Sequence, residues 1–149
     1  VYKRQPQVVS VGAVEQITFA PSSAMPEEFV DRLCYQHNPS VTLVRANAKE
    51  MARVGRAMSE KLNRSRGPVS VFLPLRGISE YAVEGGVFHD PQADEALFEA
   101  LRTGLDSRIE LVEMDVSIND PEFAIAIARK IDDLYWEATN DAAEQEDER

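Results

Sequence analysis

Four times along this chain, a short apolar run is followed by a segment with the spacing of an amphipathic helix, and this alternation limits the fold more than any other feature. Runs rich in valine and leucine are typical of buried strands. Strands that alternate with helices predict a parallel sheet covered by helices. We therefore expect an α/β fold, with a doubly wound parallel sheet of four strands or slightly more, Rossmann-like or flavodoxin-like. The expected strands are residues 7–11, 41–44, 69–73 and 109–116.

Capping signals mark where the main helices should begin. Asn47 with Glu50 three residues later is the pattern of a capping box. Asp90-Pro91 and Asp120-Pro121 each place an N-cap acid before a proline suited to the first helical turn. These signals predict three long helices, each following an expected strand.

The sequence also predicts a shorter helix that begins at Pro26 and contains the single cysteine, Cys34. One cysteine excludes a cysteine-cage zinc site, and the two histidines have no ligand spacing. We expect no metal site formed by the protein alone.

Composition indicates one globular domain and excludes some partners. The 149 residues are 44% hydrophobic and carry a net charge of −10, which disfavours binding to the phosphate backbone of nucleic acid. No apolar run approaches the roughly 18 residues of a membrane span, so a cytoplasmic protein is expected. We divide the chain into a start that need not be native (residues 1–5), one α/β domain (6–138) and a flexible acidic tail (139–149).

Polar residues follow each expected strand, at the edge where parallel sheets bind ligands. The loop after the third strand is the most informative. Its arginine, glycines and hydroxyl suit a phosphate or carboxylate, and the next helix adds its N-terminal dipole. The candidate ligand-binding residues are Arg76, Gly77, Ser79, Gly85, Gly86, Asn119 and Arg45.

Three residues are candidates for acid–base chemistry: His89, Glu15 and Asp120. Asp120 has a competing role as an N-cap, and His89 has one as an exposed loop residue. His37 precedes an expected strand, so we interpret it as a turn residue on the opposite edge of the sheet. Whether the protein is an enzyme stays open at this point.

Five spaced motifs together resemble one protein family. They are PQVVSVGA (6–13), HNP with TLVR (37–39 and 42–45), LPLRGIS (73–79), FHDPQAD (88–94) and INDPEFA (118–124). The pattern is similar to the C-terminal half of the ATP-binding domain named after the tomato mosaic virus resistance protein, an uncharacterised protein family. The resemblance covers residues 6–134.

This resemblance implies that the chain is the second lobe of a two-lobed protein whose N-terminal lobe is missing here. It implies ATP as ligand, with or without magnesium, a homo-oligomer such as a dimer, and a TIM-barrel partner protein. The family usually has an aspartate where this chain has Glu15, which leaves the role of that acid open. It also stays open which lobe holds the nucleotide.

Two functional hypotheses follow. In the first, the chain is a lobe of a nucleotide-binding, enzymatic protein that acts on small molecules, and the loop Arg76-Gly77-Ile78-Ser79 holds a small anionic ligand. In the second, the domain is a non-catalytic assembly module whose polar edge packs on another lobe or subunit. The glycine-rich loop favours the first hypothesis, because glycine lets the backbone approach a ligand closely.

Overall fold

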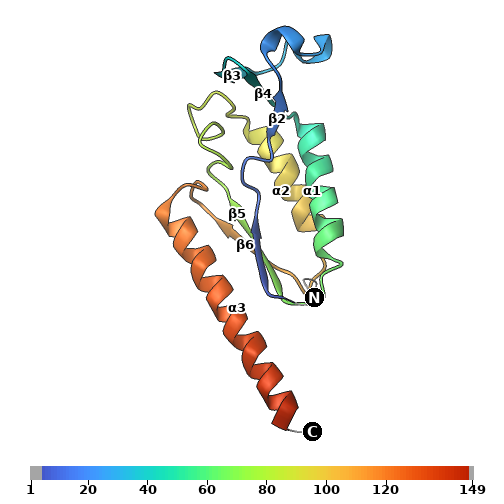
Figure 1. The fold of residues 1–149 in the computed structure, drawn as a ribbon, viewed down its shortest axis with the longest axis vertical. Coiled ribbons are helices and arrows are strands. Elements are labelled where there is room, and N and C mark those ends of the chain that lie inside the picture. The colour runs from blue at the N-terminus through green and yellow to red at the C-terminus, as the bar shows by residue number, and fades with distance from the viewer. Residues whose placement is uncertain (1–4, 148–149) are drawn as a thin grey trace.

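A computed structural model describes residues 5–147, and its centre is a parallel sheet of three strands. The strands are β1 (Gln7–Ser10), β5 (Val69–Pro74) and β6 (Glu110–Met114), in the order β1-β5-β6. Val71 in the central strand is paired with Val9 on one side and Leu111 on the other. Two helices, α1 (Ala48–Leu62) and α2 (Pro91–Gly104), cover one face, and α3 (Pro121–Asp147) covers the other (Figure 1).

The side chains of β5 alternate between the two helical layers, as the pleat of a strand requires. Val71 and Leu73 are fully buried in the main apolar core, together with residues of α1 and α2. Phe72 points to the other side, where its ring meets that of Phe123 on α3 edge-on, with 6.3 Å between the centroids. The buried central strand therefore holds both layers together.

The two helices on the first face approach each other closely at Gly55. A Cβ placed there would lie 2.8 Å from both the Ala100 Cβ and the Leu97 carbonyl oxygen, a separation that side chains do not tolerate. The small residues at this crossing allow the contact between α1 and α2, which fixes α2 and the loop before it relative to the sheet.

The predicted helix starts are confirmed for α1 and α2. The Asn47 side chain accepts a hydrogen bond from the Glu50 N–H, and the Glu50 carboxylate accepts one from the Asn47 N–H. Asp90 accepts from the Ala93 N–H ahead of α2. At α3 the helix also begins at Pro121, but the Asp120 carboxylate accepts from the Ser117 N–H at 2.6 Å and so belongs to the preceding turn.

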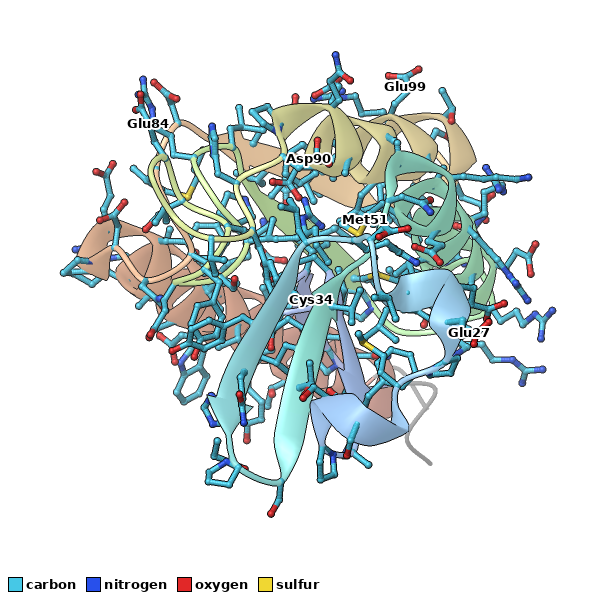
Figure 2. The ribbon with its side chains drawn as sticks, turned by 90° about the horizontal axis from the view of Figure 1, so that it is seen from above. Glu27, Cys34, Met51, Glu84, Asp90 and Glu99 are labelled. Carbon is cyan, nitrogen blue, oxygen red and sulfur yellow. The ribbon has the colours of Figure 1, made fainter. Side chains whose placement is uncertain are left out.

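The α/β class is confirmed, but the four-stranded doubly wound sheet is wrong. The strand expected at 41–44 is β4 (Val41–Arg45), which lies in a separate antiparallel sheet with β2 (Gln16–Phe19) and β3 (Cys34–Asn38), in the order β2-β4-β3. Figure 2 shows Cys34 at the base of the β3–β4 hairpin, which projects from the body of the domain. An apolar run identifies a strand but does not say which sheet it joins.

The short helix expected from Pro26 is also wrong. The chain forms brief 3-10 turns at Ser22–Ala24 and Glu27–Phe29, and Cys34 begins a strand instead of lying in a helix. β3 was missed because its residues are mostly exposed and polar, with no apolar run or strict alternation to identify it.

The outer parts of the predicted domain division fall partly outside the described residues. Residues 1–4 and 148–149 are not described, so the suggestion of a non-native start stays a prediction. The backbone of α3 is helical to Asp147, through most of the acidic segment 139–149. Within the described part of the chain, no helix has the length and hydropathy needed to cross a membrane.

Candidate functional site

The loop from residue 75 to residue 90, between β5 and α2, is folded tightly on itself. The Ser79 hydroxyl accepts hydrogen bonds from the N–H groups of Tyr81 and Ala82, both at 3.2 Å, and the Phe88 N–H donates to the Tyr81 carbonyl at 2.8 Å. Gly86 is required at its turn, because a Cβ there would lie 2.3 Å from the Tyr81 oxygen. The loop is therefore a built structure instead of a loose connection.

Gly77 and Gly85, two of the candidate residues, have the positive φ angles of +135° and +80° that favour glycine. At Gly77 a Cβ would also lie 2.8 Å from a methyl group of Val83, whereas at Gly85 the space is open. Their role in the structure is to turn the chain.

A depression of about 280 Å³ lies at the carboxyl ends of the parallel strands. The segments that follow β1, β5 and β6 all contribute to it, as the general rule for ligand sites in parallel sheets predicts. Two predicted residues, Ser79 and Asn119, lie on its wall. We call it the strand-end depression, and its lining is Gly12, Ala13, Gln16, Ile78, Ser79, Glu80, Tyr81, Ile118 and Asn119.

Three residues that line the strand-end depression have backbone N–H groups without an acceptor in the described part of the chain. Among residues 5–147, no atom accepts a hydrogen bond from the backbone N–H of Ser79, Glu80 or Asn119. Backbone N–H groups in a loop that follows a strand are common ligands of phosphate and carboxylate groups. Gly12 also lines the depression, and a Cβ there would make a tight contact of 3.2 Å with the Ile118 side chain.

Glu15 lies beneath this wall with no solvent exposure. Its Oε1 accepts hydrogen bonds from the Ser79 hydroxyl and from the Gln16 side chain, the latter at 3.1 Å. Its Oε2 has no hydrogen-bond partner among the described residues. Glu15 thus anchors Ser79, and through it the loop, to the start of β2.

Arg76 is three residues from Ser79 but lines a different depression. Its guanidinium makes a two-pronged ion pair with Asp115, at 2.7 and 2.9 Å, and both side chains are mostly exposed. This pair raises the pKa of Arg76 and lowers that of the Asp115 carboxyl. An anion at Arg76 would therefore compete with a carboxylate that is already bound.

The second depression, beside α2, has a volume of about 370 Å³ and mixed charge. Its other arginine, Arg102, is engaged by Glu95 and Glu113, at 2.5 and 2.7 Å. The imidazole of His89 lies on its rim, 3.4 Å from the Ala82 carbonyl. Both arginines thus have acidic partners in the folded protein.

Arg45 was expected to face a ligand, but its side chain points into the protein. It lies 2.6 Å from the Asp94 carboxylate, and its Nε donates to the Phe88 carbonyl at 2.9 Å. Burial raises the pKa of Asp94 to about 6, although the charge of Arg45 acts in the opposite direction. Arg45 links β4 to the loop and to α2.

The three acid–base candidates occupy different settings. Glu15 is buried, His89 is on the rim of the second depression, and Asp120 is bound to the Ser117 N–H. No hydrogen bond joins the side chains of any two of them within the described residues. In the same part of the chain, no group of three or more His, Cys, Asp and Glu residues could hold a metal ion.

Simple topology predicts that His37 lies on the opposite edge of the sheet, and this prediction is wrong. His37 lies in β3, and its Nδ1 is 3.3 Å from the Tyr81 hydroxyl, which brings the hairpin against the site loop. The ring of Tyr35 packs against the same tyrosine at a tilt of 42°, with 5.0 Å between ring centroids. Sequence reasoning missed Tyr81 because no motif marks it, and it placed His37 wrongly because β3 was unexpected.

Fold and site together define an α/β domain with a depression at the carboxyl ends of its parallel strands. Comparison with known protein families identifies the family to which the chain belongs. Residues 1–135 match the pattern described as the C-terminal domain of the Uncharacterised protein family (UPF0261), and the chain belongs to this family.

Relatives with similar sequences occur in bacteria and in a plant. The chain is 42% identical over 127 residues to a UPF0261 protein of Clostridium tetani, covering 85% of this chain and 31% of the relative. It is 43% identical over 131 residues to UPF0261 protein RA0729 of Rhizobium meliloti, covering 87% and 33%. It is 35% identical over 127 residues to the ToMV resistance protein Tm-1(GCR237) of Solanum lycopersicum, covering 84% and 17%. The chain spans about a third of the length of the bacterial relatives.

Proposed function

We propose that this chain is one lobe of a nucleotide-binding protein and that the phosphate groups of the nucleotide lie in the strand-end depression. The observation that carries the proposal is the set of unused backbone N–H groups of Ser79, Glu80 and Asn119 on its wall. ATP is the nucleotide that the family resemblance implies, and backbone amides that donate to no other acceptor suit its phosphates.

The sequence analysis expected the anion at Arg76, whereas we propose that it binds the backbone amides of the strand-end depression. Arg76 already pairs with Asp115 and lines the other depression, so a phosphate gains less there. Magnesium would be held through the phosphates, since the described residues offer no cluster of ligands for it. Among the described residues, the candidate acids and bases His89, Glu15 and Asp120 make no hydrogen bond to one another. We therefore propose nucleotide binding without a reaction.

Thermal unfolding with and without Mg·ATP tests the proposal. ATP at 100 times its dissociation constant should stabilise the chain by about 2.7 kcal/mol. Asn119→Asp should abolish this shift, because an exposed carboxylate at the amides repels phosphate. Arg76→Ala is the matched control and should keep the shift.

Two results would contradict the proposal. If Arg76→Ala loses the shift and Asn119→Asp keeps it, the anion lies in the second depression. If Mg·ATP leaves the unfolding temperature of the chain unchanged, this lobe does not bind the nucleotide. The assembly-module hypothesis would then be favoured, and light scattering of the wild type and Arg76→Ala would test it.

A further inference from the structure

The two edges of the parallel sheet differ in a way that indicates a missing neighbour. At the β6 edge, Glu110 pairs with Lys130 at 2.7 Å and Glu113 pairs with Arg102 at 2.7 Å. Charged side chains of this kind protect an edge strand from pairing with another strand. At the other edge, β1 has the sequence QVVS, with no charged residue and every residue half-buried.

The backbone of β1 has hydrogen-bonding groups directed at this unprotected edge. The Gln7 N–H donates to the Pro68 carbonyl at 3.0 Å, on the β5 side. Because polar groups of successive residues in a strand point to opposite sides, those of Val8 and Ser10 point to the free edge. A further strand would find two N–H and two C=O groups available there.

Helix α3 has an apolar flank above the same edge. It packs against β1 and β5, with Leu134 buried toward the sheet. Lys130 marks the β6 side of the helix through its ion pair with Glu110. At about 100° per residue, Ile131 and Tyr135 lie on the opposite flank, the β1 side, and they are 37% and 56% exposed.

The chain also enters at this place. In Figure 1 the start of β1 lies at the lower end of the sheet, and the later turns of α3 extend past the same end. The bacterial relatives are about three times as long as the matched segment, and the matching family pattern is that of a C-terminal domain. A preceding part of the polypeptide would therefore arrive beside β1 and the flank of α3.

We propose that the segment of the longer polypeptide that precedes residue 1 adds a strand to the free edge of β1 and packs apolar side chains on Ile131 and Tyr135 of α3. The parallel sheet then continues into the preceding part of the protein. This surface is separate from the strand-end depression, and the proposal does not depend on nucleotide binding.

Hydrogen exchange measures the added strand directly. The amides of Val8 and Ser10 should exchange at least about 100-fold more slowly in the full-length polypeptide than in the 149-residue chain. The amide of Val9 is the internal control, since it faces β5 in both proteins. Equal exchange rates for Val8 and Ser10 in the two proteins would overturn the proposal.

A pair of substitutions tests the α3 flank. Ile131→Asp should lower the unfolding temperature of the full-length polypeptide by several degrees more than that of the 149-residue chain. Ile125→Asp is the matched control, because Ile125 is on the same helix and is 51% exposed. At about 100° per residue, it lies on the opposite face of the helix from Leu134. It should have equal effects in both proteins.

The Ile131→Asp variant also distinguishes the preceding segment from a second copy of the chain as the occupant of this surface. If Ile131→Asp has equal effects in both proteins, the preceding segment does not cover the flank. If the full-length polypeptide is a dimer by light scattering and Ile131→Asp makes it a monomer, a second copy occupies the surface. Either result would overturn the proposal.

Discussion

The guanidinium of Arg45 lies 2.6 Å from the carboxylate of Asp94, and the two side chains are only 2% and 11% exposed. The pair joins the antiparallel sheet to the first turn of α2, and the Phe88 carbonyl completes the contact. A residue that the sequence placed among the ligand-binding candidates thus ties β4 to the end of the 75–90 loop and to α2.

Asp94→Ala should lower the free energy of unfolding by about 3 kcal/mol or more, because it leaves Arg45 buried without its counter-charge. Asp115→Ala is the matched control: it breaks the Arg76 pair, which is mostly exposed, and should cost about 1 kcal/mol or less. Urea denaturation of both variants at neutral pH measures the difference. Similar losses would mean that the Arg45 pair is no more important than a surface pair.

Asp94 should also give the protein a defined pH dependence. Its pKa is about 6 in the folded protein and 3.8 in the unfolded chain, so the folded state binds the extra proton between these values. This contribution to stability is complete below pH 3.8 and is lost as the pH rises through about 6.

The free energy of unfolding of the wild type minus that of Asp94→Asn should therefore fall as the pH rises from 3.8 to 7, by about 3 kcal/mol. Taking the difference cancels the contributions of Glu50, Glu110 and Asp115 to the pH dependence of stability. The pKa values of these groups are lowered, so their contributions have the opposite sign. A difference that is constant with pH, or that rises, would contradict the assignment.

The sequence located the local features well and the long-range ones poorly. The capping box at Asn47 and the N-cap at Asp90 were predictable because they involve residues three positions apart. The direction of the Arg45 side chain was not, since its partner Asp94 is 49 positions away. The antiparallel sheet was missed because β3 is polar and mostly exposed.

At the site, topology was the more useful guide. Ser79 and Asn119 were expected to converge because both follow strands of one parallel sheet, and they line the same depression. Arg76 was expected to join them. The chain turns sharply at Gly77, however, so Arg76 and Ser79 line different depressions. A single sequence does not show which way such a loop turns.

Ser79→Ala should destabilise the protein by about 1–3 kcal/mol. The change removes the hydroxyl that donates to the buried Glu15 carboxylate and accepts from two backbone N–H groups. Thr103→Ala is the control, because its hydroxyl bonds the Glu99 carbonyl on an exposed helix surface. Thermal unfolding of the two variants should show a clear loss for the first and a small change for the second.

Gly86→Ala should be more damaging than Gly85→Ala. The new methyl group at Gly86 would meet the Tyr81 carbonyl oxygen at 2.3 Å, so the loop must open. At Gly85 there is open space, and the cost is the roughly 1–2 kcal/mol of a left-handed backbone with a side chain. Denaturant unfolding ranks the two, and the reverse order would contradict the described loop geometry.

The loop that contains Ser79 is tied down at both ends and within itself, by Glu15, by the Tyr81–Phe88 backbone contact and by Arg45. A small molecule that enters the strand-end depression would therefore meet walls already in place, and binding would not have to order a mobile segment. Pre-organisation of this kind lowers the entropic cost of association. Calorimetry of the binding step would then show little heat capacity change beyond that of the surface the ligand itself buries.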